Sequence, residues 1–101
     1  MFVFEDIVTL DNRSIQRVIR DVENDDLLLS LKVASEEVKS IIFKNMSSRM
    51  VETFKEEMEF MGPVRLKDVE EAQSRIVAGI RRLEDAGEIV LARGGGDDII
   101  V

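Results

Sequence analysis

The chain has 101 residues, 45% apolar content and a net charge of −7, which is enough for one domain with a single core. This acidic balance disfavours nucleic acids and anionic membranes as partners, because both attract basic surfaces. The sequence contains neither cysteine nor histidine, so disulfides, thiol chemistry and the commonest zinc ligands are excluded. We find no nucleophile–base pair, metal cluster or cofactor loop, and expect neither an enzyme nor a bound cofactor or metal. We also expect no direct membrane insertion, since no apolar run approaches the roughly twenty residues of a membrane span.

The first third of the chain is predicted to be helical and is interrupted by capping residues. Phe4–Leu10 is compatible with either a short helix or a hinge. Asp11 is a suitable N-cap for a helix over about Arg13–Val22, whose apolar residues recur at three- and four-residue spacing. Asn24–Asp26 predicts a turn, and the very apolar stretch Leu27–Ala34 predicts a short buried helix.

Two serines predict the starts of the next two helices. Ser35 precedes Glu36 and Glu37, whose carboxylates favour the positive end of a helix. Asn45–Ser48 breaks that helix, and Ser47 is the expected cap of the one that follows.

The helix within Asn45–Arg65 has two contrasting faces, and Gly62-Pro63 ends it. Helical spacing gathers an apolar face from Met50, Val51, Phe54, Met58 and Met61. The opposite side carries Arg49, Glu52, Glu56 and Glu57, with Lys55 and Glu59 at a margin. Phe60 also falls on the charged side, where we expect it to cover the turn at Gly62; the alternative is a place in a contact patch.

The last predicted helix is the longest. Asp68 and Glu71 match a capping box at its start, and Gly87 suits its C-terminal cap. Its apolar stripe consists of Val69, Ala72, Ile76, Ile80 and Leu83. The apolar triplets Ile89–Leu91 and Ile99–Val101 flank Arg93–Asp98, which fits a small hairpin or a tail. We favour a flexible C-terminal tail over residues 92–101. About six helices with short connections predict an all-α domain, either a bundle or a short armadillo-like superhelix.

Several stretches, taken in order, resemble the carboxy-terminal domain of the flagellar motor switch protein FliG. They are MFVFEDI at Met1–Ile7, RSIQRVIRDV at Arg13–Val22, LKVAS at Leu31–Ser35, KNMSSR at Lys44–Arg49, GPVRLKDVEEAQ at Gly62–Gln73 and RRLEDAGEIV at Arg81–Val90. The resemblance covers nearly the whole chain. The family protein is expected to be about three times longer, so this chain looks like a fragment of it.

The resemblance implies a rotor component of the bacterial flagellar motor, at the cytoplasmic face of the inner membrane. It also implies a MotA-type stator subunit as partner, together with neighbouring rotor subunits, namely FliM and further FliG copies. Residues 1–10 would form a hinge and linker, 11–91 the helical torque-generating domain, and 92–101 the tail.

The family's functional charges, carried over by position, fall on Lys32, Arg49, Glu56, Glu57 and Arg65. Met1, Phe2 and Phe4 match its Met-Phe-x-Phe hinge, which the resemblance implies takes part in switching the direction of rotation. Val33 stands where the family usually has glycine, so a positive φ at that position would be strained.

The alternative function is a winged-helix DNA-binding regulator. In that interpretation Val69–Leu83 would be the recognition helix and Glu88–Val101 the wing. Acidic residues around that helix and the net charge of −7 argue against it.

Overall fold

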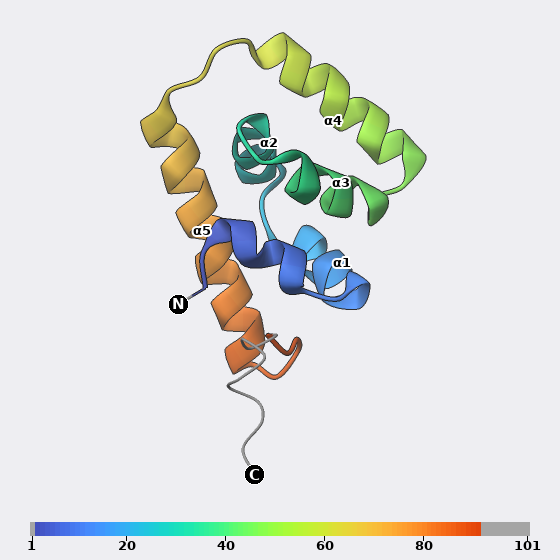
Figure 1. The fold of residues 1–101 in the computed structure, drawn as a ribbon, viewed down its shortest axis with the longest axis vertical. Helices are drawn as coiled ribbons and strands as arrows, with labels where there is room; N and C mark the ends of the chain where they lie inside the picture. Colours follow the sequence, from blue (N-terminus) through green and yellow to red (C-terminus); the bar gives the residue numbers. More distant parts are fainter. Residues whose placement is uncertain (1, 92–101) are drawn as a thin grey trace.

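The computed structural model describes residues 2–91, and these form six helices, as predicted for an all-α domain (Figure 1). They are the 3₁₀ helix η1 (Phe4–Thr9) and the α-helices α1 (Asn12–Asp21), α2 (Asn24–Lys32), α3 (Glu36–Lys44), α4 (Ser48–Met61) and α5 (Leu66–Asp85). The predicted tail, residues 92–101, and Met1 lie outside the described residues.

Helices α2 and α5 form the centre of the core. They make the most extensive contact between any two elements, and η1, α1 and α4 pack around this pair (Figure 1). The predicted stripe of α5 is buried, because its three- and four-residue spacing keeps it on one side of the helix. The five predicted positions, Val69, Ala72, Ile76, Ile80 and Leu83, are all buried. Ile89, just after α5, joins the same core.

The predicted helix ends rest on local hydrogen bonds. Each predicted N-cap side chain accepts a hydrogen bond from the backbone N–H of the residue three positions further on. This confirms the N-caps Asp11, Ser35 and Ser47. Gly62 and Gly87 have φ values of 64° and 76°, a region that costs little only for glycine, so each ends its helix where predicted.

Two boundaries were predicted wrongly. Asn24–Asp26 is the first turn of α2 rather than a separate turn, with Asp25 and Asp26 at the positive end of the helix. The capping box at Asp68 is also wrong, because α5 already begins at Leu66. The amide of Val69 donates to the carbonyl oxygen of Arg65 at 3.1 Å, which places Asp68 inside the first turn.

The substitution at Val33 is accommodated without backbone strain. Val33 follows the last residue of α2 with φ −118°, so this helix end needs no left-handed residue. Lys32 therefore stays in the last turn of a regular helix.

Candidate functional site

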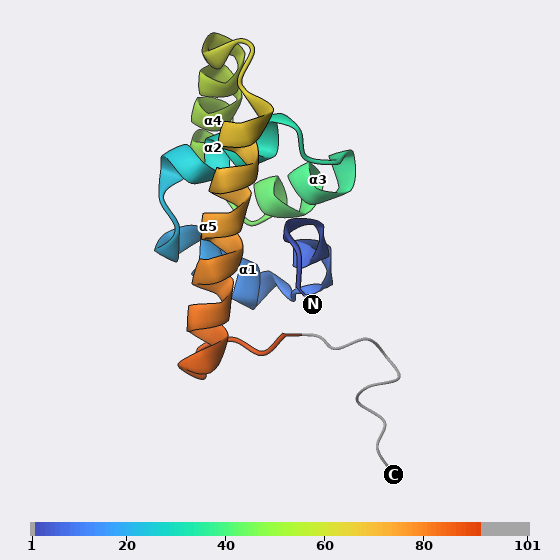
Figure 2. The ribbon, with the colours of Figure 1, turned by 90° about the vertical axis from the view of Figure 1, so that its left-hand side faces the viewer.

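Helix α4 lies at the edge of the domain, crossing the body on the side away from the C-terminal half of α5 (Figures 1 and 2). Among its 14 residues only Phe54 is buried, at 3% exposure. Met50, Met58 and Met61 are half-buried and pack against the core, as expected for its apolar face. One side of α4 is thus held by the fold while the other faces outward.

Helix α4 is tied to α2 at its C-terminal end, where Nζ of Lys32 donates to the carbonyl oxygen of Met58 at 3.0 Å. The segment before α4 is fixed at the end of α3. There the side-chain amide of Asn45, the C-cap of α3, donates to the carbonyl oxygen of Ile41 at 2.8 Å and to Oδ1 of Asn12 on α1 at 3.1 Å. The carbonyl group of Met58 belongs to the last turn of α4, where helices leave acceptors unpaired and favour a positive charge. The bond from Lys32 therefore holds the C-terminal end of α4, while the bonds of Asn45 hold the end of α3 that precedes it.

The outward side of α4 carries Arg49, Glu56 and Glu57, which we call the charged face. All three are exposed, and none takes part in an ion pair within residues 2–91. Arg49 and Glu56 are seven residues apart and lie about 20° apart around the helix, two turns from each other. Their charges therefore remain available to a partner at a spacing set by the helix.

The other two predicted charges are placed differently. Arg65 is exposed at the start of α5, beyond the turn that ends α4. Lys32 is half-buried, and its ammonium group is engaged with Met58. The structure thus brings Arg49, Glu56 and Glu57 together on one helix, and it gives Lys32 a role in holding that helix. Sequence reasoning missed this contact, because nothing local pairs residues 26 positions apart.

The aromatic residues near α4 differ in their surroundings. Nζ of Lys55 lies 5.6 Å from the ring centroid of Phe43, which is half-buried. Phe60, in contrast, is 93% exposed, so the expectation that it covers the turn at Gly62 is wrong. The signal was present in the sequence, since Phe60 follows Glu56 by four residues and shares its side of the helix.

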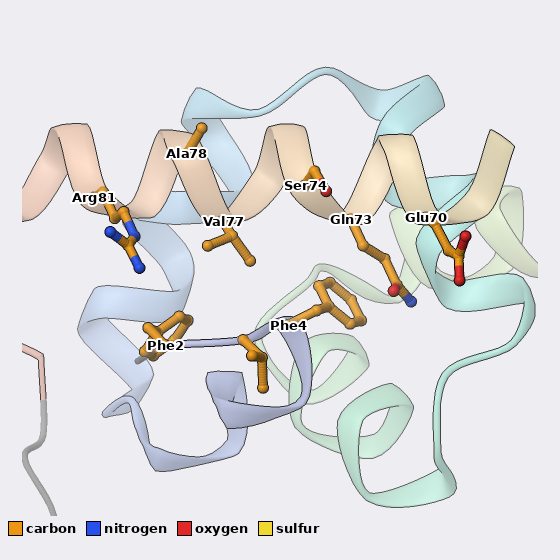
Figure 3. Close-up of a pocket in the computed structure, with 9 residues that line it drawn as sticks. Phe2, Phe4, Glu70, Gln73, Ser74, Val77, Ala78 and Arg81 are labelled. Carbon is orange, nitrogen blue, oxygen red and sulfur yellow. The ribbon is translucent and has the colours of Figure 1, made fainter. Parts of the chain in front are cut away.

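Phe2 and Phe4 of the predicted hinge lie on the opposite part of the molecule, against α5. Phe2 and Phe4 point toward that helix and line an open groove of about 550 Å³ (Figure 3). Val77 and the polar residues Gln73 and Arg81 form its other wall. Phe4 is buried and Phe2 half-buried, so both act as packed side chains in this conformation.

A polar contact fixes the first helix to the body. The Ser35 hydroxyl donates to Oε1 of Glu5 at 2.8 Å, joining η1 to the start of α3. Ile7 of η1 is also buried in the core. The division at residue 10 remains a prediction.

Within residues 2–91, no group of three or more acidic side chains is arranged to hold a metal ion. In the same part of the chain, none of the helices has the length and apolar character that crossing a membrane would require.

Fold and surface together define a small all-helical domain that holds a charged helix at the edge of its core. The chain belongs to the family described as the FliG C-terminal domain, whose profile matches residues 1–91. It is 89% identical over all 101 residues to the flagellar motor switch protein FliG of Bacillus subtilis, and 64% identical to that of Thermotoga maritima. The chain spans about 30% of the length of these curated relatives.

Solved structures agree with this assignment. A crystal structure of a FliG fragment from Helicobacter pylori superposes with a TM-score of 0.89 at 40% identity, covering 91% of this chain and 40% of that one. Full-length FliG from Aquifex aeolicus gives a TM-score of 0.83 at 39% identity, covering 86% of this chain and 27% of that one. The family resemblance inferred from the sequence motifs is confirmed.

Proposed function

We propose that this domain is part of the rotor of the bacterial flagellar motor and receives torque from a MotA-type stator subunit through the charged face of α4. It works at the cytoplasmic face of the inner membrane, beside FliM and further FliG copies. Similarity to flagellar motor switch proteins supports this role over that of a winged-helix regulator.

The observation that carries the proposal is the contrast between the two sides of α4. Phe54 is buried on one side, while Arg49 and Glu56 are exposed and outside every ion pair of residues 2–91 on the other. Lys32 holds the C-terminal end of the helix, and the half-buried Met50 and Met58 pack against the core. A helix fixed in this way transmits a sideways force to the core instead of yielding to it.

The strength of surface charge contacts suits repeated engagement. An exposed ion pair contributes about 0.2–1 kcal/mol, and screening limits its reach to about 8 Å at physiological salt. Such contacts form and break quickly. That behaviour fits a surface that meets a passing stator many times, and it would fit a permanent joint poorly.

The groove beside α5 supports a second part of the proposal, the change of rotation direction. Phe2 and Phe4 line this groove and face α5 in the present conformation (Figure 3). Withdrawal of these rings would free the preceding part of the protein to reorient against the domain. Phe2 and Phe4 would then act as the packed side chains of a hinge.

The proposal is tested by reversing charges in the full-length protein. The variant Arg49→Glu with Glu56→Lys keeps the net charge but inverts the pattern on α4. In a strain lacking its own switch protein, we expect strongly reduced swimming and partial recovery when the facing stator charges are reversed as well.

A matched control reverses exposed charges elsewhere. Arg20→Glu with Asp85→Lys alters α1 and α5, again without changing the net charge. This variant should swim normally. Normal swimming of the α4 variant, with normal protein levels, would contradict the proposal.

A further inference from the structure

The most exposed large apolar side chain among residues 2–91 lies on the outward side of α4. Phe60 is 93% exposed, whereas Phe4 and Phe54 are buried and Phe2 and Phe43 are half-buried. An exposed ring forgoes the stabilisation that burial of an aromatic side chain provides. Phe60 therefore contributes nothing to the core, and packing within the domain does not explain an aromatic residue at this position.

Phe60 belongs to the same surface as the charged face. It follows Glu56 by four residues and Glu57 by three, which places it about 40° from Glu56 around the helix and one turn further along. Arg49 lies about three turns back along the helix. The surroundings of the ring on α4 are consequently acidic, and the negative end of the helix dipole lies within the same turn.

We propose that Phe60 is the apolar anchor of the stator contact, inserting its ring into an apolar pocket of the stator subunit that is bordered by a lysine or arginine. This inference rests on the proposed function and adds the residue that gives the contact its geometry. The basic border follows from charge complementarity with Glu56 and Glu57, and the pocket from the uncovered ring.

The charged residues and the Phe60 ring contribute differently to the stator contact. Charges steer the approach and are screened by salt, so they contribute mainly to the rate of encounter. A ring of this kind buries about 150–250 Å² when covered, and aromatic residues dominate the energetics of many interfaces. The anchor then sets how long each encounter lasts, in a way that depends little on ionic strength.

The test measures binding of full-length switch protein to the purified stator complex of the same organism in nanodiscs. We expect Phe60→Ala to weaken binding at least about tenfold, as for other aromatic anchors. The deficit should persist between about 0.05 and 0.5 M salt, whereas that of Arg49→Glu with Glu56→Lys should fade as screening increases. Phe60→Leu should recover part of the affinity.

The matched control is Val90→Ala. Val90 is also strongly exposed, at 83%, but it follows α5 at the other end of the domain. The affinity of the Val90→Ala variant for the stator complex should stay within about twofold of that of the parent protein, as for substitutions away from an interface. Helical content measured by circular dichroism checks that every variant is folded.

The outcomes separate the two proposals. If Phe60→Ala binds like the parent while the charge-reversed protein binds weakly at low salt, the anchor is wrong and the torque surface stands. If neither variant loses affinity, the proposed function fails as well. A deficit of Phe60→Ala that disappears at high salt would also overturn the anchor, because it would then be electrostatic.

Discussion

Helices α5 and α4 are joined by a short turn but relate to the core in opposite ways. Helix α5 buries six of its 20 residues and has its largest contact with α2. Helix α4 buries one of 14 and is otherwise half-buried or exposed. Helix α5 supplies stability, whereas α4 depends on a few contacts to stay in place.

This difference shows how a small domain carries a rigid surface without burying it. Phe54 holds the middle of α4, and a hydrogen bond from Lys32 holds its C-terminal end. The outward face of the helix is left free for charge. Substitutions on α5 should therefore change the stability of the whole domain, while those on α4 should change the position of one helix.

The largest effect is expected in the α5 core. Ile76 is 0% exposed, so Ile76→Ala loses its apolar burial and leaves a cavity at a cost of about 2–5 kcal/mol. Urea unfolding of the purified chain, followed by circular dichroism, measures this loss. Ser74→Ala, exposed on the same helix, should change stability by less than about 0.5 kcal/mol. A comparable loss for both variants would contradict the assigned core.

A similar substitution on α4 should act locally. Phe54→Ala removes the one buried side chain of the helix, and we expect the free energy of unfolding to fall by about 3 kcal/mol. Hydrogen exchange should accelerate in α4 more than in α2. Phe60→Ala makes the same chemical change on the exposed side and should leave the exchange pattern unaltered. Uniform acceleration across all helices would show that α4 is not a separate unit.

A smaller effect is expected at the end of α4. Lys32→Met keeps most of the apolar stem but removes the ammonium group that donates to the carbonyl oxygen of Met58. The free energy of unfolding should fall by about 1 kcal/mol, and amide hydrogen exchange should become faster only in the last turn of α4. Lys44→Met, at the exposed end of α3, serves as control. Equal effects of the two lysines would remove the case for a specific contact.

The smallest effect concerns pH. Hydrogen bonds from the hydroxyl and then the amide of Ser14 lower the pKa of Asp11, which caps α1. A carboxyl with a lowered folded-state pKa contributes stability above its unfolded pKa of about 3.9, and this is lost as pH falls through the folded-state value. Asp11→Asn still caps but does not titrate, so its stability should fall less between pH 5 and the acid limit. Identical pH profiles would contradict the shift.

Local signals predicted much of this fold. Ser35 and Ser47 cap helices as expected, and the stripe from Val69 to Leu83 is buried throughout. The start of α5 was misplaced, because it depends on how the chain leaves the turn at Gly62. The exposure of Arg49, Glu56 and Glu57 was anticipated from helical spacing. That of Phe60 was not, since an aromatic residue beside a turn was expected to pack.

The amino-acid sequence by itself determined most of the helix boundaries and which side of α4 carries charge, because capping and periodicity involve residues within a few positions of one another. Only the tertiary structure decided that Lys32 closes the end of α4 and that Phe2 and Phe4 face α5. These contacts join segments far apart in the chain. Their formation depends on how whole helices pack, and no local pattern encodes that arrangement.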